Sequence, residues 1–122
     1  MKRERIDYWI ALSEYDLVVA RALFDKGHYL YVGFMCHQSI EKMLKACCVN
    51  NDLTPPPIHK LDKLLDMSGL RTALTEDQFD LIDELTPLNI QARYPVHKDA
   101  IYKLVGKSKA VEILARTEEF VA

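Results

Sequence analysis

The segment Arg93-Tyr-Pro-Val-His97 carries side chains that suit phosphate chemistry. Tyr94 precedes a proline and is biased away from helix, whereas Pro95 is favoured at the first position of a helix, so His97 is expected in a first turn. Free backbone N–H groups, the positive end of a helix dipole, a guanidinium and an imidazole would then lie near one another. The sequence therefore predicts an anion site at this segment.

Arg93 and His97 could supply two of the three groups that RNA cleavage without a metal requires. These groups remove the 2′-hydroxyl proton, protonate the leaving oxygen and stabilise the charge that develops on phosphorus. A second interpretation stays open. In that interpretation Arg93 pairs with a carboxylate in the core or at an interface, and His97 is only solvated.

A second polar group lies between Gly33 and Ala46. Helical spacing puts four polar side chains on one face of an otherwise apolar helix, and they are Gln38, Glu41, Lys42 and Lys45. Glu41 can pair with Lys45 four residues later, and Arg93 is another candidate partner, whose guanidinium the carboxylate would orient. We predict that these four residues bind nucleotide or phosphate together with Arg93 and Tyr94.

Other kinds of site are not indicated by the sequence. His37 and Glu41 are four residues apart, but a third and a fourth metal ligand are not evident. The four glycines are scattered, so a glycine-rich phosphate loop and ATP hydrolysis are not expected. No signature of a serine nucleophile is recognisable. We expect neither a metal nor a cofactor.

Composition limits the possible partners. The chain has 122 residues, the usual size of one domain, and we expect a single domain over residues 1–122. A net charge of −2 excludes a globally basic nucleic-acid binder, so any RNA contact must be local. A group of four lysines could provide such a contact, or it could form a solvated helix face. These residues are Lys98, Lys103, Lys107 and Lys109.

Nothing in the sequence predicts export or membrane insertion. The basic N-terminal residues are followed by acidic residues, unlike a signal peptide, and no apolar run is long enough to span a bilayer. Cys36, Cys47 and Cys48 lack the spacing of metal ligands. We expect a cytoplasmic protein in which these cysteines are reduced, small core residues.

Hydrophobic periodicity predicts helices over about residues 4–26, 29–50, 59–67, 75–85 and 108–121. Gly27 is expected to end the first helix, and the second should pair antiparallel with it across a short turn. Gly33 lowers the stability of the second helix by about 1 kcal/mol relative to alanine, so we expect a close helix contact there.

Local signals indicate where the shorter helices begin and end. The run 50–57, with three prolines, cannot continue a helix. Thr75 and Gln78 form a capping box, and Thr86-Pro87 is expected to end the helix that follows. Because no segment shows strand-type alternation, we predict an all-α, up-and-down helical bundle with two long antiparallel N-terminal helices and shorter helices after them.

Three motifs resemble the HEPN family of small helical proteins, which bind nucleotides or RNA and often accompany a minimal nucleotidyltransferase. They are the Gln-x-x-Glu-Lys-x-x-Lys pattern from Gln38 to Lys45, the run His59-Lys-Leu-Asp-Lys-Leu-Leu65, and the Arg-Tyr-Pro type segment at residues 93–97. The resemblance implies a HEPN-like fold over nearly the whole chain. His59 corresponds to a family histidine that makes a capping or core hydrogen bond, so we assign it no catalytic role.

In ribonuclease members of the family, an Arg, four to six intervening residues and a His act across a homodimer cleft. Here three residues separate Arg93 from His97, and Asp99 stands where a tyrosine is common. The resemblance implies a homodimer with a nucleotidyltransferase-like partner that binds nucleotide or RNA. If the protein cleaves RNA, it would be a metal-independent ribonuclease and the toxin of a toxin–antitoxin pair. The alternative is a non-catalytic helical module for dimerisation and partner binding.

Overall fold

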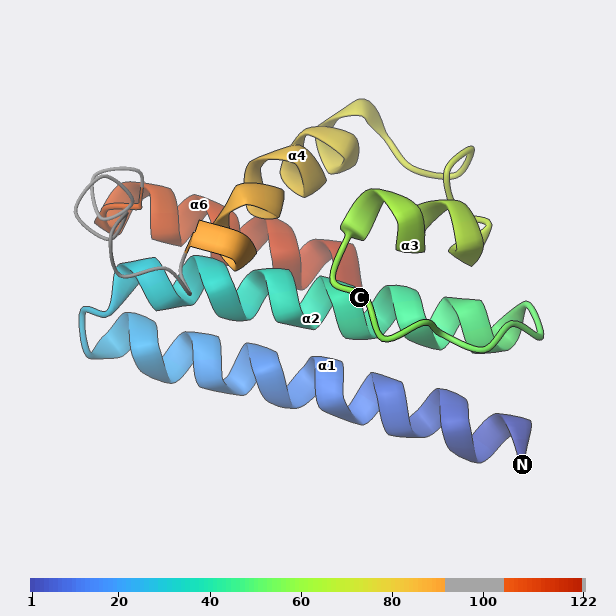
Figure 1. Cartoon of the computed structure of the whole chain (residues 1–122). Helices are drawn as coiled ribbons and strands as arrows, with labels where there is room; N and C mark the ends of the chain where they lie inside the picture. Colours follow the sequence, from blue (N-terminus) through green and yellow to red (C-terminus); the bar gives the residue numbers. More distant parts are fainter. Residues whose placement is uncertain (92–104, 122) are drawn as a thin grey trace.

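The computed structural model describes residues 1–91 and 105–121, with only the backbone of residues 89–91. These residues form five helices and no strand: α1 (Lys2–Asp25), α2 (Tyr29–Asn50), α3 (Leu61–Ser68), α4 (Glu76–Gln91) and α6 (Lys107–Val121) (Figure 1). The two long N-terminal helices run antiparallel, as the hydrophobic pattern predicted. The predicted all-α fold is therefore confirmed.

The turn between α1 and α2 is built around Gly27, which has a φ of +80°. The N–H of Gly27 donates to the carbonyl of Phe24, and the N–H of His28 donates to that of Leu23. These two bonds satisfy carbonyls at the helix end and require a left-handed residue between them. The predicted role of Gly27 in ending the first helix is confirmed.

α2 is the central helix, because it packs against each of the other four. Its apolar residues Cys36, Ile40 and Leu44 are completely buried. They belong to a core that takes residues from every helix, including Ala20, Leu30, Val32, Leu61, Leu64, Leu65, Leu81, Leu85, Ala110 and Ile113. A helix covered on so many sides leaves few positions for polar side chains in water, so the polar residues of α2 must find partners inside the protein.

Two serines join α1 to α2 where the helices approach closely. The hydroxyl of Ser13 donates to the carbonyl of Ser39 at 2.8 Å, and the hydroxyl of Ser39 donates to the carbonyl of Ser13 at 2.9 Å. Both residues are completely buried. The reciprocal bonds satisfy both hydroxyls and set the register of the two long helices.

The connection from α2 to α3 contains no helix, as the prolines predicted. Asn51 follows the end of α2, and its side-chain amide donates to the carbonyl of Ser68 at 2.6 Å. α3 then ends at Gly69, which has a φ of +76°. The C-terminal ends of α2 and α3 are therefore tied together.

The capping box that begins α4 is present. The N–H of Gln78 donates to the Thr75 hydroxyl at 3.2 Å, and the N–H of Thr75 donates to the Gln78 side chain at 2.9 Å. The predicted end of this helix at Thr86-Pro87 is wrong, because α4 continues to Gln91 with Pro87 inside it.

Packing explains why α4 continues through Pro87. Leu85 and Leu88, on either side of the proline, are 0% and 3% exposed and belong to the core. The hydroxyl of Thr86 donates to the carbonyl of Ile82 at 2.7 Å and supports the helix at this point. The apolar burial outweighs the hydrogen bond that proline cannot make.

Gly33 allows the C-terminal part of α4 to approach α2. A Cβ atom at this position would lie 2.7 Å from Cδ1 of Leu88 and 3.8 Å from Cγ2 of Val105. The expected close contact at Gly33 is confirmed. Leu88 and Val105 are the described side chains nearest in sequence to the two ends of the segment 92–104.

Charged side chains join α4 to α6 at the surface. Glu84 accepts from Lys109 and from Arg116, the latter at 2.6 Å, and Arg116 also lies 3.2 Å from a carboxylate oxygen of Asp77.

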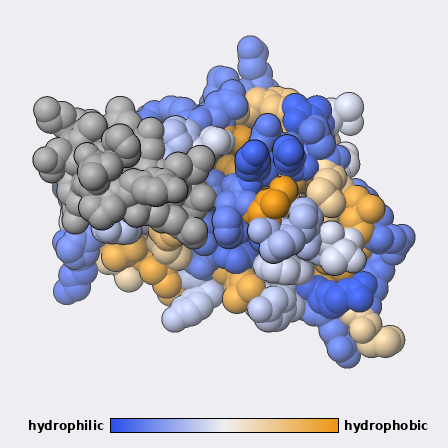
Figure 2. Space-filling model, viewed as in Figure 1, coloured by the Kyte–Doolittle hydropathy of each residue, from blue (hydrophilic) through white to orange (hydrophobic). Residues whose placement is uncertain are grey.

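On the face shown in Figure 2, hydrophobic side chains form small separate groups among hydrophilic ones. No helix in the described part of the chain is long and apolar enough to cross a membrane.

Candidate functional site

Glu41 is a buried carboxylate on α2 that contacts Lys45 of the same helix and the half-exposed His59 of the segment before α3. Its carboxylate oxygens lie 2.9 and 3.0 Å from Nδ1 of His59, and one of them lies 3.4 Å from Nζ of Lys45. The side chains of Glu41 and Lys45 are 1% and 7% exposed. A buried carboxylate requires such donors, because an unpaired charge in the interior is strongly destabilising. The predicted Glu41–Lys45 pair is present, but it lies in the interior and not at the surface.

The segment between α2 and α3 brings His59 to Glu41. Figure 1 shows this segment running back along α2 from its C-terminal end. His59 therefore lies before α3, which begins at Leu61, and the prediction that the third helix begins at residue 59 is wrong by two residues. The hydrogen bond expected for His59 is the one that it donates to the Glu41 carboxylate.

Two residues of α1 contact the lysines of α2. Asp16 lies 3.3 Å from Nζ of Lys42, and burial raises the pKa of Asp16 although Lys42 counteracts this effect. Nζ of Lys45 lies 5.3 Å from the centre of the Trp9 ring, a cation–π contact. Both lysines of α2 are thus paired with a carboxylate on the protein.

His37 and Gln38 add polar atoms that are buried and have no hydrogen-bond partner among the described residues. His37 is 1% exposed, and within the described residues neither of its ring nitrogens nor Oε1 of Gln38 has a hydrogen-bond partner. Burial lowers the pKa of His37 to about 4, although the Glu41 carboxylate, 3.8 Å away, acts in the opposite direction. His37 is therefore a neutral imidazole at pH 7.

We call Gln38, Glu41, Lys42 and Lys45, together with His37 and His59, the α2 polar cluster. It unites the four residues that the sequence predicted on one helix face. Arg93, Tyr94 and His97, the other predicted site residues, lie outside the described residues, as do Lys98, Asp99 and Lys103. The described side chains nearest to them in sequence, those of Leu88 and Val105, both lie beside Gly33, one turn of α2 before His37.

The cluster is suited to orienting a cationic group more than to binding a phosphate directly. Glu41 carries a negative charge, and Lys42 and Lys45 are already paired. A carboxylate that is held by two donors keeps lone pairs for a further donor such as a guanidinium. The polar face is thus a fixed support at which another residue could be positioned.

Metal and thiol chemistry find no support among the residues that the structure describes. No group of three or more His, Cys, Asp and Glu side chains there could hold a metal ion. Cys36 and Cys48 are buried and Cys47 is partly buried, and all three are free thiols. Burial raises the pKa of Cys36 to about 12, so this thiol is not a nucleophile at neutral pH.

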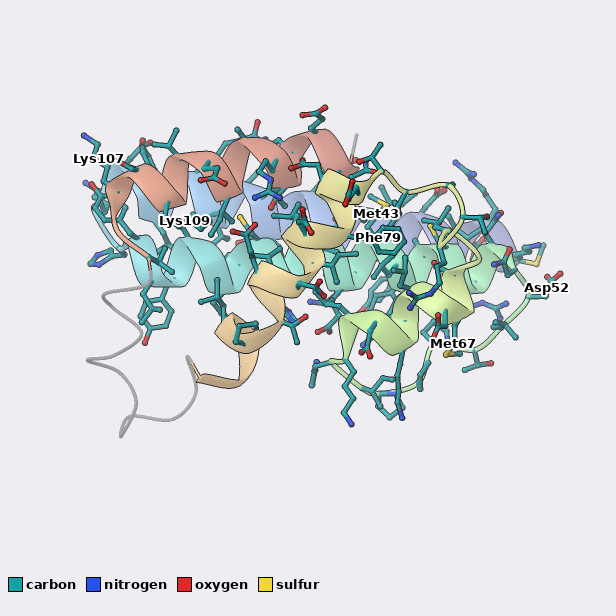
Figure 3. The ribbon with its side chains drawn as sticks, turned by 90° about the horizontal axis from the view of Figure 1, so that it is seen from above. Met43, Asp52, Met67, Phe79, Lys107 and Lys109 are labelled. Atoms are coloured by element: carbon teal, nitrogen blue, oxygen red, sulfur yellow. The ribbon has the colours of Figure 1, made fainter. Side chains whose placement is uncertain are left out.

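Of the four lysines proposed as a basic group, Lys107 and Lys109 lie together at the N-terminal end of α6 (Figure 3). Lys109 pairs with Glu84, and this bond raises the pKa of Lys109. Lys107 is exposed. The part of the lysine group that is described is therefore a solvated helix end with one of its two charges neutralised.

One surface was not identified from the sequence. The outer face of α1 carries exposed residues at alternating intervals of three and four, namely Tyr8, Ala11, Tyr15, Val18 and Ala22, which we call the α1 outer stripe. Tyr8, Tyr15 and Val18 are 58%, 61% and 56% exposed. This spacing is a heptad pattern that could have been found in the sequence, although periodicity alone does not tell which of two apolar stripes on a helix faces the core.

Comparisons with known proteins agree with this architecture. The fold is similar to the crystal structure of TT1696 from Thermus thermophilus, with a TM-score of 0.81 and 21% sequence identity over 96% of this chain and 93% of that one. No curated protein sequence matches the chain. The family model described as HEPN domain matches residues 6–122, which include the α2 polar cluster and all but the first residues of the helical fold. The chain therefore belongs to the HEPN domain family.

Proposed function

We propose that this HEPN domain protein is a cytoplasmic, homodimeric protein that binds nucleotide or RNA through its phosphates, acts with a nucleotidyltransferase-like partner, and cleaves RNA without a metal. Arg93 and Tyr94 would contact the phosphate, and Gln38, Glu41, Lys42 and Lys45 would form the support of the site. Arg93 and His97 would carry the cleavage step.

The observation that carries this proposal is the burial of three members of the α2 polar cluster, His37, Glu41 and Lys45. Glu41 and Lys45 lie in the interior, where an ion pair contributes little net stability and apolar residues of similar volume can do as well or better. His37 and Gln38 add buried polar atoms without partners among the described residues. Such a group is costly to folding, which supports a role in positioning other groups and not only in stability.

The anchors of the segment 92–104 support a place for Arg93 near the cluster. Leu88 and Val105 both contact the α2 surface at Gly33. Glu41 follows Gly33 by eight residues, which is about 12 Å along a helix. We propose that the Glu41 carboxylate orients the guanidinium of Arg93 toward a phosphate oxygen.

In the proposed cleavage, His97 takes the proton of the 2′-hydroxyl, and the 2′-oxygen attacks phosphorus while the bond to the 5′-oxygen breaks. Arg93 stabilises the negative charge on the phosphoryl oxygens. A second His97, from the other protomer, would protonate the leaving oxygen. The proposal therefore needs two copies of the chain.

The α1 outer stripe supports the homodimer. Five exposed residues with heptad spacing, two of them tyrosines, form an apolar seam of the kind that pairs helices. Three apolar residues of α2 are less favourable as dimer residues, because Tyr31 is only 38% exposed and Phe34 and Met35 are partly buried.

The test uses labelled single-stranded RNA in excess chelator with the wild type and the variants Arg93→Ala and His97→Ala, each shown to be folded by circular dichroism. We expect the wild type to cleave, and each variant to lose at least about a hundredfold in rate. Arg93→Ala should also weaken RNA binding by about tenfold, since Arg93 supplies a charged hydrogen bond. Arg71→Ala is the matched control, because this exposed arginine pairs with Asp66 and contacts the ring of Phe79, and neither residue belongs to the proposed site.

A second candidate function is a non-catalytic module for dimerisation and partner binding, which the exposed α1 outer stripe favours. RNA that is bound but stays intact would support the binding site without cleavage. A wild-type protein that neither binds nor cleaves RNA would overturn the proposed function in favour of the module.

A further inference from the structure

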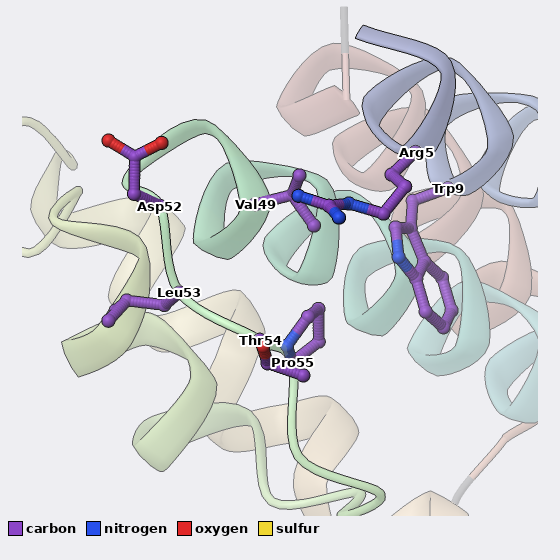
Figure 4. A pocket seen from close by; sticks show the side chains of 7 residues that line it. All are labelled: Arg5, Trp9, Val49, Asp52, Leu53, Thr54 and Pro55. Atoms are coloured by element: carbon purple, nitrogen blue, oxygen red, sulfur yellow. The ribbon is translucent and has the colours of Figure 1, made fainter. Parts of the chain in front are cut away.

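A groove lies between the N-terminal part of α1 and the segment that follows α2 (Figure 4). It has a volume of about 280 Å³ and is lined by Arg5, Trp9, Val49, Asp52, Leu53, Thr54 and Pro55. In Figure 4 the Arg5 side chain extends from α1 across the groove toward Val49, whereas the Asp52 carboxylate points away. The charged group that faces the groove is therefore a cation.

The shape of this groove is set by the end of α2. Asp52 has a φ of +62°, its N–H donates to the carbonyl of Val49 and the N–H of Leu53 donates to the carbonyl of Cys48, both at 2.9 Å. This pair of bonds is the usual C-terminal helix motif with a left-handed residue. It fixes the start of the segment that forms the wall opposite α1.

Arg5 differs from the other arginines that the structure describes. Each of the others pairs with a carboxylate, as in Arg3 with Asp7, Arg21 with Glu118, Arg71 with Asp66, and Arg116 with Glu84. Arg5 makes no such pair within the described residues. The only carboxylate that lines the groove, Asp52, lies 2.9 Å from Nζ of Lys2 instead.

The position of Arg5 adds to its unsatisfied charge. It lies in the first turn of α1, where Lys2, Arg3 and Arg5 outnumber the single acidic residue Glu4 at the positive end of the helix dipole, an end where cations are unfavourable. Lys2 and Arg3 are compensated by carboxylates, and Arg5 is not compensated by any described residue. A helix end that accumulates positive charge and keeps one guanidinium unpaired is complementary to an anion.

The remaining groove wall is apolar. Trp9, Val49 and Pro55 line it, and Leu53 is 42% exposed there. A guanidinium next to an indole and aliphatic groups fits a ligand with a phosphate and a flat or apolar part, as in a nucleotide unit of single-stranded RNA. From these features we propose that the groove is a second nucleotide subsite for single-stranded RNA, in which Arg5 contacts a phosphate and Trp9 contacts the ribose or base.

This subsite rests on the proposed RNA-binding function, and the α2 polar cluster links the two sites. Trp9 contacts Lys45, which pairs with Glu41. Val49 in the groove follows Glu41, which is proposed to orient Arg93, by eight residues, or about 12 Å along α2. At about 3.4 Å per stacked nucleotide, twelve nucleotides reach about 40 Å, whereas a single nucleotide covers only about 3.4 Å. A long RNA can therefore occupy both sites, and a mononucleotide cannot.

The test measures the binding of a fluorescent 12-nucleotide RNA and a fluorescent mononucleotide by anisotropy, in chelator and at several salt concentrations. We expect Arg5→Glu to weaken binding of the 12-mer by about ten- to hundredfold, and to lower the slope of log affinity against log salt by about one. Binding of the mononucleotide at the Arg93 site should change by less than about twofold. Arg3→Glu is the matched control, because it makes the same change in the same helix turn but Arg3 does not line the groove.

A second variant tests the apolar wall of the groove and leaves Arg5 unchanged. Leu53→Glu places a negative charge in the groove and should weaken binding of the 12-mer by about tenfold, whereas Val111→Glu, at a 49% exposed position on α6, should not. Both residues are exposed enough for the variants to fold.

The outcomes separate the two proposals. If the wild type binds RNA with a dependence on Arg93 but Arg5→Glu behaves like Arg3→Glu, the subsite is overturned and the proposed function stands. If binding depends on Arg5 and not on Arg93, the subsite stands and the Arg93 phosphate site is overturned. A wild type that binds neither the 12-mer nor the mononucleotide overturns both the subsite and the proposed RNA-binding function.

Discussion

At the scale of single residues, the molecule is distinguished by polar groups that it keeps inside. Glu41 is satisfied by His59 and Lys45, whereas the ring nitrogens of His37 have no partner within the described residues. The difference decides the charge of each group. Glu41 has donors that stabilise a carboxylate, but an imidazolium at His37 would be buried, and the Glu41 carboxylate 3.8 Å away offsets only part of the cost of that burial.

This difference predicts how stability depends on pH. The pKa of His37 falls from 6.5 to about 4 on folding, because burial disfavours the charged form. Below pH 6.5 the unfolded chain therefore binds a proton that the folded chain does not, and the free energy of unfolding decreases as the pH falls. The loss should reach about 2 kcal/mol at pH 5 and about 3 kcal/mol near pH 4, and none of it should occur above pH 7.

The measurement is urea denaturation between pH 4 and pH 8 for the wild type and His37→Phe. The variant cannot titrate at this position. Lowering the pH should therefore reduce its free energy of unfolding less than that of the wild type, by about 2 kcal/mol at pH 5 and about 3 kcal/mol near pH 4. His28→Gln is the control, because His28 is exposed and makes no side-chain capping bond. Parallel pH profiles for the wild type and His37→Phe would show that His37 is not buried in the neutral form.

At the scale of the helices, close packing at α2 decides where α4 runs. Gly33 has no Cβ, so Leu88 can lie against the α2 backbone, and Leu88 is carried there because α4 continues through Pro87. The two local irregularities, a glycine within one helix and a proline within another, are therefore explained by the same helix contact.

Gly33→Ala tests this contact. Alanine should favour the helix by about 1 kcal/mol, but its Cβ would lie 2.7 Å from Cδ1 of Leu88, and overpacking of a core costs about 1–3 kcal/mol. We expect Gly33→Ala to lower the free energy of unfolding by about 1 kcal/mol, as measured by chemical denaturation.

The companion measurement places Gly33→Ala in a Leu88→Ala background. Leu88→Ala alone should be destabilising, because it truncates a core residue. In this background the clash is absent, so Gly33→Ala should raise stability by about 1 kcal/mol. Additive effects in the double-mutant cycle would mean that Gly33 and Leu88 do not interact.

At the scale of the whole molecule, α1 is a helix with two apolar faces. The inner face carries Ile6, Leu17 and Ala20, which are buried. The α1 outer stripe faces solvent on the opposite side of the helix, as follows from the spacing of 100° per residue. A single copy of the chain leaves this second face uncovered, which is the arrangement expected of a helix that joins two copies.

Tyr15→Glu should therefore disrupt the proposed dimer, because Tyr15 is in the middle of the α1 outer stripe and is 61% exposed in a single copy of the chain. Burying an unpaired carboxylate at a helix seam should raise the dissociation constant at least about tenfold without unfolding the chain. Sedimentation velocity at micromolar concentration measures this change.

Val111→Glu provides the comparison, since Val111 is 49% exposed on α6 and outside the stripe. Its dissociation constant should match that of the wild type. A monomeric wild type, or equal weakening by both variants, would contradict dimerisation through α1.

How much of this structure the sequence predicts depends on the range of the interaction involved. The extents of α1, α2 and α6, the turn at Gly27 and the capping box at Thr75 follow from signals within a few residues, and these predictions are correct. The end of α4 and the start of α3 are wrong, because Leu88 packs on a distant helix and His59 bonds to a residue of α2.

The candidate site divides in the same way. The sequence by itself determined that Gln38, Glu41, Lys42 and Lys45 share a helix face, because helical geometry makes residues three and four apart neighbours. Only the tertiary structure decided that Glu41 and Lys45 are buried while Arg5 and the α1 outer stripe are exposed. Burial depends on which distant segments cover a helix, and the contact between His59 and Glu41 forms across 18 residues of chain. Periodicity within one helix cannot contain that information.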